Sequence, residues 1–397
     1  MAVERENLYR FPWSKTDNPG AWIEVTDICD LSCPSCFRHH LEGHRSLDVI
    51  KEEILTCQRH TNCERIAIAG GEPLIYPEIL EVVEFISKQG MKPVLMTNGH
   101  SLTSELACEF RKAGLAQFFF HVDSGQQRPG WEGKNEIELN ELRQYYADMV
   151  WNLRGVLCGY NLTITRKNLD YLPDIVHWGS KNIQKVQNLT LIAVRALLVS
   201  NGIEYKAGNE SVDVSGLSCS TDNSSEIDIT SDEMLEVLQR ANPNLLPCAF
   251  LNGTVNTDTN KFLVIVPIGC KHELYGVAGA KTVELSQTLH HFCTGRYTSF
   301  TKAPRPSKSI FLLSLIDSKV RTALKNLLSA SVRNPLRLFQ KVHLQCVNLV
   351  QPTEIIEGEK NFCDGCINLI PWKGKMVHSC VLDEYRMFGK PIRPSEY

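Results

Sequence analysis

The stretch Cys29-Asp30-Leu31-Ser32-Cys33-Pro34-Ser35-Cys36 decides the fold, because its three cysteines have the spacing C-x3-C-x2-C directly after a strand-like run, Ala21 to Thr26. Three thiolates this close together can hold an iron–sulfur cluster. A fully ligated 4Fe–4S cluster takes four cysteines, so one iron here would keep an open position. The alternatives are buried cysteines without a ligand role and a zinc site closed by a fourth ligand, for which His39, His40 and His44 are available.

A second motif lies downstream, in Ile66-Ala67-Ile68-Ala69-Gly70-Gly71-Glu72-Pro73. It is a short apolar strand that ends in two glycines, an acid and a proline. The glycines allow the backbone to approach a ligand closely, and the glutamate supplies an anion for an ammonium group. Alone, such a run is typical of a turn. Together, the cysteine motif after one strand and this motif after the next resemble the radical S-adenosylmethionine (SAM) superfamily.

The resemblance extends to the ends of two further predicted strands, Met96-Thr97-Asn98-Gly99 and Phe120-His121-Val122-Asp123-Ser124. It implies that Cys29, Cys33 and Cys36 hold a 4Fe–4S cluster whose open iron binds SAM. This sequence has Ser35 where many members carry an aromatic residue, a departure that concerns the contact with adenine and not the cluster. The residues to which the resemblance gives a role in binding SAM are Gly70, Gly71, Glu72, Pro73, Asn98, Asp123 and Ser124.

Length and composition limit the class of protein. At 397 residues, with 43% hydrophobic residues, the chain predicts one large barrel with an accessory region, and its formal charge of -3 argues against a globally basic nucleic-acid binder. Residues 1–7 lack the apolar segment of a signal peptide, and the longest apolar runs are far shorter than the ~20 residues of a membrane span. We therefore expect a soluble, cytoplasmic protein whose fifteen cysteines serve as thiols and metal ligands.

Strand-like runs alternate with segments of helical periodicity from Ala21 to Val194. This pattern predicts an α/β fold with a parallel sheet, specifically a partial (β/α)6 TIM-type barrel with a C-terminal accessory extension. In such barrels the chemistry lies at the C-terminal ends of the strands, where both motifs fall. The expected divisions are a lead-in (1–20), the radical SAM partial barrel (21–195), an insertion with a basic amphipathic segment (196–345) and a cysteine-rich auxiliary metal-cluster region (346–397).

The segment 302–341 carries nine Lys or Arg residues against one acid, Asp317, and interleaves them with large apolar residues. One interpretation is a helix that packs on the open side of the barrel and leaves a basic face in water. The others are a site for an anionic substrate and a membrane surface.

The C-terminal segment has its own cysteines, which are Cys346, the knuckle Cys363-Asp364-Gly365-Cys366, and Cys380. A predicted hairpin over Ile370 to Cys380 would bring the last cysteine toward the knuckle. This arrangement resembles the SPASM or twitch domains that follow many radical SAM barrels and implies a second iron–sulfur cluster with these four cysteines as ligands. The seven-cysteine pattern of a full SPASM domain is missing, which favours one auxiliary cluster, and a structural zinc site is the alternative.

The resemblance implies an enzyme, an oxidoreductase or a transferase, that cleaves SAM reductively to a 5'-deoxyadenosyl radical and abstracts hydrogen from a peptide or small molecule. It implies an external electron donor such as flavodoxin or ferredoxin. The residues assign no catalytic side chain, although His121, Gln126, Arg128 and Arg195 are candidates to line the pocket. The competing functions are a non-catalytic iron–sulfur or zinc protein for electron transfer or scaffolding, and a radical SAM enzyme that acts on RNA.

Overall fold

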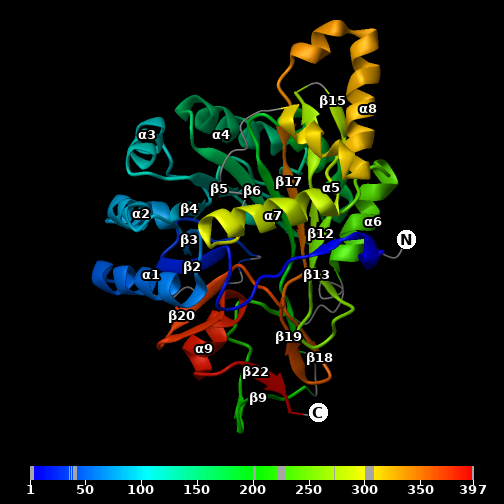
Figure 1. Cartoon of the computed structure of the whole chain (residues 1–397). Helices are drawn as coiled ribbons and strands as arrows, with labels where there is room; N and C mark the ends of the chain where they lie inside the picture. The colour runs from blue at the N-terminus through cyan, green and yellow to red at the C-terminus, as the bar shows by residue number, and fades with distance from the viewer. Residues whose placement is uncertain are drawn as a thin grey trace.

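The computed structural model describes residues 4–34, 36, 38, 43–199, 203–221, 229–271, 273–299 and 308–395. A ten-stranded sheet forms its centre, with strands in the order β1-β12-β13-β17-β7-β6-β5-β4-β3-β2. Helices α1 to α4 lie along the outside of the parallel half of this sheet (Figure 1). No closed barrel forms from the described strands, since β1 and β2 end the order on opposite sides.

Six parallel strands alternate with helices, which confirms the predicted partial (β/α)6 barrel. Each helix places apolar residues toward the sheet at intervals of three and four residues, as Ile79, Val82, Val83 and Ile86 do in α2. The elements in order are β2 (Gly20–Thr26), α1 (Leu47–Thr61), β3 (Arg65–Gly70), α2 (Ile79–Lys88), β4 (Lys92–Thr97), α3 (Ser104–Lys112), β5 (Gln117–His121), α4 (Asn140–Leu153), β6 (Leu157–Ile164), α5 (Leu172–Lys181) and β7 (Asn188–Ala193).

The sheet continues beyond β7, which the sequence did not predict. Strand β17 pairs parallel to β7, β13 pairs antiparallel to β17, and β12 pairs antiparallel to β13. Strand β1 then pairs parallel to β12. The bounds are β1 (Tyr9–Arg10), β12 (Ala249–Asn252), β13 (Asn260–Ile265) and β17 (Cys346–Val350). The first and last parts of the chain therefore help to build one sheet with the barrel strands.

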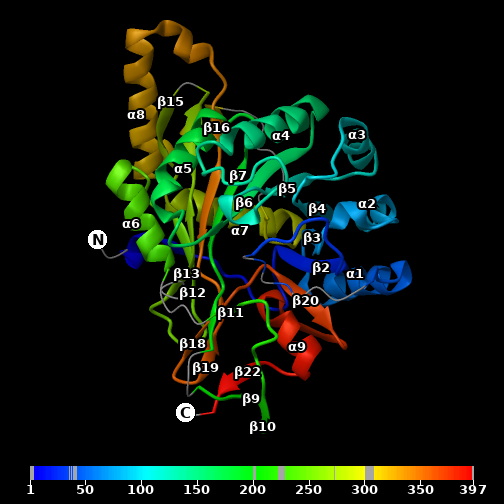
Figure 2. The same cartoon turned by 180° about the vertical axis from the view of Figure 1, so that it is seen from behind.

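A second hydrophobic core lies beside this extension, between a small antiparallel sheet and the helices that follow it. These elements are β14 (Pro267–Cys270), β15 (Glu273–Val277), α7 (Ala280–Thr294), η6 (Lys308–Leu315), α8 (Ser318–Arg333), η7 (Pro335–Phe339) and β16 (His343–Leu344). Helix α6 (Ser231–Ala241) packs its buried residues into the main core instead. We call η6, α8 and η7 the helical arm. It projects from the end of the molecule opposite to the C-terminal elements (Figures 1 and 2).

The C-terminal segment folds against the other end of the sheet as short strands and one helix. The predicted hairpin is present as β20 and β21, whose turn contains Lys373 and Gly374. The C-terminal elements are β18 (Glu354–Ile356), β19 (Glu359–Asn361), β20 (Leu369–Trp372), β21 (Lys375–His378), α9 (Leu382–Phe388) and β22 (Ile392–Pro394). Strand β22 pairs with β9 (Tyr205–Ala207) of an earlier segment, whose other short strands are β8 (Leu197–Leu198), β10 (Glu210–Val212) and β11 (Ser220–Thr221). Among the helices of the described ranges, none combines the length and hydrophobicity needed to cross a bilayer.

A buried ion pair fixes the segment that leads from β5 into α4. Arg143 pairs with Glu136, and both side chains are fully buried. Glu136 also accepts hydrogen bonds from the backbone N–H and the hydroxyl of Ser124, at 2.9 and 2.8 Å. Loss of one partner would leave the other charge buried without compensation.

We therefore expect Glu136→Gln to lower the free energy of unfolding by about 3–5 kcal/mol. The matched control is Glu138→Gln, two residues away, because Glu138 pairs with Lys134 on the exposed surface, where water screens the pair. Urea unfolding of both variants, followed by circular dichroism, measures the difference. Equal midpoints for the two variants would contradict a structural role for the buried pair.

Candidate active site and metal centres

A cavity of about 370 Å³ opens at the C-terminal ends of the parallel strands. Its lining combines the two groups of cysteines that the sequence analysis singled out with the motif residues at the ends of β3 and β4. Among the lining residues are Cys29, Cys33, Cys36, Gly70, Gly71, Glu72, Asn98, His121, Cys346, Cys363, Cys366 and Cys380. Segments more than three hundred residues apart in the chain thus share one space.

The loop with the first three cysteines is held from the end of β4. Asp30, which follows Cys29, accepts a hydrogen bond from Asn98 Nδ2 at 2.7 Å and another from Ser101 Oγ at 2.7 Å. Within the loop, the backbone N–H of Cys36 donates to the carbonyl of Cys33 at 3.0 Å. These contacts fix the loop at the mouth of the cavity. Ser35, His39 and His40 lie outside the described residues.

Burial dominates the acid–base properties of these thiols. It raises the pKa of Cys29 to about 11 and the pKa of Cys33 to about 12. The charge that Cys36 carries when it is ionised raises both pKa values further. Burial also raises the pKa of Cys36, against the opposing effect of Arg38. The thiols are therefore protonated near neutral pH, and binding of a metal must release their protons.

Gly70 and Gly71 are required because two backbone segments cross there. A Cβ atom on Gly70 would lie 2.1 Å from the carbonyl oxygen of Thr26, and one on Gly71 would lie 2.1 Å from that of Ile28. The backbone N–H of Gly71 donates a hydrogen bond to the carbonyl oxygen of Thr26, and the backbone N–H of Glu72 donates one to that of Ile28, both at 2.8 Å. The glycines therefore fasten the end of β3 to the segment that leads into the cysteine loop.

The carboxylate of Glu72 is buried and joins the ends of β3 and β4. Oε1 accepts hydrogen bonds from Leu74 N at 2.9 Å and Thr97 Oγ1 at 2.6 Å, and Oε2 accepts one from Asn98 N at 2.7 Å. A carboxylate has about four acceptor positions, so it retains capacity for one further donor. Burial raises the pKa of Glu72 to about 7, although these hydrogen bonds oppose the rise.

The remaining predicted SAM-binding residues lie at neighbouring strand ends. Asp123 is buried and accepts hydrogen bonds from His121 Nε2 at 2.6 Å and from the backbone N–H of Thr163 at 2.8 Å. Burial alone would raise its pKa, but His121 and these hydrogen bonds hold the pKa below its usual range. Ser124 is bound to Glu136, and Pro73 begins the short helix η2 (Pro73–Ile75). Of these residues, His121 also lines the cavity.

Three of the four C-terminal cysteines, Cys363, Cys366 and Cys380, line the same cavity and are close enough to affect one another electrostatically. Burial raises the pKa of the thiols of Cys363, Cys366 and Cys380, and the negative charge of Cys380 raises the pKa of the other two further. Two contacts to backbone atoms position the knuckle. Asn18 Nδ2 donates a hydrogen bond to the carbonyl of Cys366 at 2.8 Å, and the backbone of Cys363 forms an isolated antiparallel β-bridge with that of Gly253. The knuckle is thus attached to the start of the chain and to the sheet extension.

Cys346 occupies a different position from the other three. It is the first residue of β17 and pairs with Asn188 of β7. Burial raises the pKa of Cys346 to about 12. When Cys346 is ionised, its charge raises the pKa of the neighbouring Cys248. It lines the same cavity as the knuckle, but from within the central sheet.

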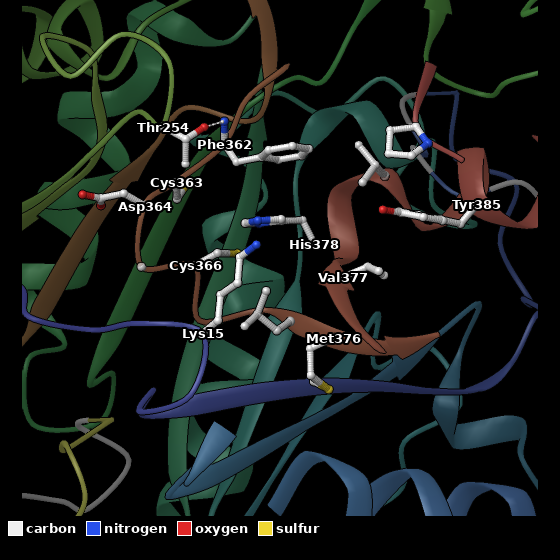
Figure 3. A pocket seen from close by; sticks show the side chains of 14 residues that line it. Lys15, Thr254, Phe362, Cys363, Asp364, Cys366, Met376, Val377, His378 and Tyr385 are labelled. Atoms are coloured by element: carbon white, nitrogen blue, oxygen red, sulfur yellow. Dashed lines mark hydrogen bonds between the residues drawn. The ribbon is translucent and has the colours of Figure 1, made fainter. Parts of the chain in front are cut away.

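His378 is a site residue that the sequence analysis missed. His378 lines both this cavity and a second pocket of about 290 Å³ that shares Phe362, Cys363 and Cys366 with it. The ring stacks on Phe362, with 4.1 Å between ring centroids, and points toward the side of the second pocket where Cys366 and Lys15 lie (Figure 3). Its buried Nδ1 has no hydrogen-bond partner among the described residues. Burial and the charge of Lys15 lower its pKa to about 4, so the ring is neutral at physiological pH. The signal in the sequence was its place two residues before Cys380.

Buried charges connect the two cysteine groups, which no local pattern could indicate. Arg38, two residues after Cys36, lies 2.5 Å from Glu24 and 3.6 Å from Asp383. The neighbouring Glu384 pairs with Arg195 at 2.7 Å. Of the other pocket candidates, Arg128 is buried and donates to the carbonyl oxygens of Asn98 and His121, and Gln126 lines the cavity.

Both groups of thiols suit an iron–sulfur cluster in residue type and grouping. In the part of the chain that the structure describes, no three His, Cys, Asp or Glu side chains converge closely enough to hold a single metal ion. A 4Fe–4S cluster places each cysteine on a different iron, so its ligands need not converge on one point. Sulfur ligands lining one buried space on two walls are compatible with that geometry.

Part of the chain matches a family model. Residues 23–153 match the model of the Radical SAM superfamily. The chain is 24% identical to the tungsten-containing aldehyde ferredoxin oxidoreductase cofactor-modifying protein of Pyrococcus furiosus, over 45% of this chain and 50% of that protein. It is 26% identical to the AdoMet-dependent heme synthase of Methanosarcina barkeri, over 49% and 53%. It is 33% identical to the GTP 3',8-cyclase of Marinobacter nauticus, over 26% and 32%. The matches thus span about half or less of these relatives.

Solved structures give more distant similarities. The structure of anSMEcpe with bound AdoMet aligns with a TM-score of 0.40 and 15% identity, over 57% of this chain and 60% of that one. Streptococcus suis SuiB bound to S-adenosylmethionine aligns with a TM-score of 0.39 and 14% identity, over 56% and 47%.

Proposed function

We propose that this chain, whose residues 23–153 match the Radical SAM superfamily, is an enzyme that cleaves SAM reductively and modifies a substrate by hydrogen abstraction. The single observation that carries the proposal is the shared cavity. The motif residues Cys29, Cys33, Cys36, Gly70, Gly71 and Glu72 and the strand-end residues Asn98 and His121 are far apart in the sequence, yet they line one cavity. In barrels of this type the chemistry lies at the C-terminal ends of the strands.

We propose Cys29, Cys33 and Cys36 as the ligands of a 4Fe–4S cluster. Such a cluster with an open iron supplies the low-potential electron that splits bound SAM into methionine and a 5'-deoxyadenosyl radical. The chain binds and orients the reactants. Glu72 has acceptor capacity for the amino group of SAM, and Asn98 holds the cysteine loop through Asp30. Gly70, Gly71 and Pro73 shape the strand end, while Asp123 holds the cavity-lining His121 and Ser124 is bound to Glu136.

His121 is our candidate for moving a proton within the cavity. Its Nε2 is hydrogen-bonded to the buried Asp123, and the ring lines the cavity. A carboxylate in this position orients the imidazole, so that its other nitrogen, Nδ1, is the one available to exchange a proton with a substrate that has lost a hydrogen atom.

We further propose a second iron–sulfur cluster at Cys363, Cys366 and Cys380, within residues 346–397. A second cluster in the same cavity suits the removal of an electron from a substrate radical, which favours an oxidoreductase over a transferase. The substrate class is a peptide or small molecule. An electron donor of the flavodoxin or ferredoxin type would supply the electron for reductive cleavage, and a reducing compartment such as the cytoplasm would keep the cysteines as thiols. A role confined to electron transfer or scaffolding predicts no cleavage of SAM.

Iron content tests the two clusters. Reconstituted wild-type protein should contain about eight irons per chain, as expected for two cubanes. The variant with Cys29, Cys33 and Cys36 all replaced by Ala should retain about four irons and should form no 5'-deoxyadenosine from SAM under dithionite. Iron and zinc are measured by plasma mass spectrometry and the products by chromatography. About four irons in the wild type, with one zinc and no iron in the variant, would show that the C-terminal metal is a zinc ion.

The fourth ligand of the second cluster is either Cys346, as the sequence predicted, or His378. His378 points toward Cys366 with an unpaired buried nitrogen, whereas Cys346 lies in the central sheet. In the background that lacks the first cluster, we expect a nitrogen hyperfine coupling in pulsed EPR of the reduced protein, since a His ligand on iron produces one. His378→Ala should remove this coupling, while Cys346→Ala, the matched control, should keep it. Loss of the cluster in Cys346→Ala alone would establish Cys346 as the ligand.

Glu72 should make SAM binding depend on pH. Its pKa is raised to about 7, so lowering the pH from about 7.5 to about 6 protonates the carboxylate and weakens binding, by up to tenfold per unit. Glu72→Gln should bind SAM roughly 10- to 100-fold more weakly at pH 7.5, because it loses one charged hydrogen bond. Its affinity for SAM should not change between about pH 7.5 and about pH 6, and the variant should keep its iron. Anaerobic equilibrium dialysis measures the affinity. The same pH profile in both proteins would exclude Glu72 as the titrating group.

A further inference from the structure

The helical arm, residues 308–339, packs on the molecule with one face of α8. Val320, Ala323 and Leu327 are buried on that face and belong to the core that contains Tyr275 of β15. Asp317 is buried at the start of α8, where its carboxylate accepts hydrogen bonds from the backbone of Lys319 and from Thr282. The inner face and the acid of the segment are therefore both satisfied within the protein.

The outer face of the arm exposes large apolar side chains to an unusual degree. Leu315 is 83% exposed, Val332 is 85% exposed and Phe339 is 83% exposed. Exposed residues recur along α8 at intervals of three and four, which places them on one stripe of that helix. η7 follows after the extended Asn334 and exposes apolar residues of its own. The further exposed apolar residues of the arm are Leu312, Ile316, Leu328, Leu336 and Leu338.

Positive charge is interleaved with these apolar residues. Arg321 and Lys325 precede Leu328 and Val332 on the same stripe of α8, at positions i, i+4, i+7 and i+11. The guanidinium of Arg321 donates to the carbonyl of Leu315, so η6 joins this stripe. The exposed basic residues in or next to the arm are Lys308, Arg321, Lys325, Arg333 and Lys341. Arg337 is partly buried and lies 3.9 Å from Glu273. The outer face is thus positive, although the chain as a whole has a charge of -3.

We propose that the helical arm binds the surface of an anionic lipid bilayer. The apolar side chains enter the boundary between headgroups and acyl chains, and the Lys and Arg side chains contact the anionic headgroups. This inference is independent of the proposed chemistry. It assigns a role to the outer face of the arm, whereas packing against β15 accounts only for the inner face.

Two features favour a bilayer over a protein as the occupant. The arm is a projecting element rather than a groove (Figures 1 and 2), and a bilayer accepts a convex apolar surface without needing a matching pocket. Its aliphatic residues and interleaved Lys and Arg have the composition of an interfacial amphipathic helix. A second copy of the chain would bring the same positive charges against one another.

Vesicle sedimentation of the full chain tests the proposal. Wild-type protein should bind vesicles of phosphatidylcholine with about 30% phosphatidylglycerol at least tenfold more tightly than vesicles of phosphatidylcholine alone. Raising the salt from about 0.1 M to about 0.5 M NaCl should weaken binding. Neutralising three charges, with Arg321→Gln, Lys325→Gln and Arg333→Gln together, should weaken binding to the anionic vesicles on the order of 100-fold.

The apolar contribution has a matched control in the same chain. Leu328→Ser, Val332→Ser and Phe339→Ser together should also reduce binding on the order of 100-fold. Leu289→Ser with Phe292→Ser should leave it unchanged, because these residues of α7 are similarly exposed, at 52% and 86%, but lie outside the arm. All substitutions are on the surface, and thermal unfolding verifies the fold. Failure of the wild type to bind anionic vesicles, or equal loss in the control, would overturn the proposal. If the wild-type protein does not bind vesicles but its sedimentation coefficient rises with protein concentration, the outer face would instead be assigned to contact with a second copy of the chain.

Discussion

The structure depends on a cluster of buried charges between the two cysteine groups. Arg38 lies between Glu24 of β2 and Asp383 of α9. Arg386, one turn along α9, lies 3.0 Å from Glu24 and 2.9 Å from Asp27. Buried ions are tolerated only when well paired, so a shift of α9 would leave charges of the barrel without partners. The C-terminal segment is therefore held in one position relative to the cysteine loop.

A second set of charges extends this connection to the rest of the C-terminal segment. Glu384 accepts hydrogen bonds from Arg195, at the end of the barrel, and from Lys360 next to the knuckle, both at 2.7 Å. Its other oxygen accepts one from the backbone of Ile392 in β22. Because Cys380 precedes these acids by three and four residues, the network also fixes the third cysteine of the C-terminal group. The two proposed clusters would need a fixed separation, and paired ions in a dry interior would provide one.

The sequence predicted the features that depend on residues close to one another in the chain. The six strands of the barrel, the hairpin of β20 and β21 and the placement of Glu72 and Asn98 at strand ends all follow from periodicity and from residues next to strands. The partners of β17 could not be predicted, because pairing between residues 346–350 and 188–192 leaves no trace in spacing. The pairing of Arg38 with Asp383 also joins distant segments. For the same reason, spacing placed Cys346 with the knuckle, whereas the fold places it in the sheet.

The position of the helical arm constrains how substrate and electrons reach the cavity. The arm projects at one end of the molecule and α9 and β22 lie at the other (Figure 1). If the arm lies on a bilayer, the elements that carry Cys380 and its charge network are directed away from the lipid. A water-soluble electron donor can then approach that end without competing with the membrane. The interfacial contact would bring the enzyme to the membrane surface, and the cavity would remain open to a substrate that arrives from the aqueous side.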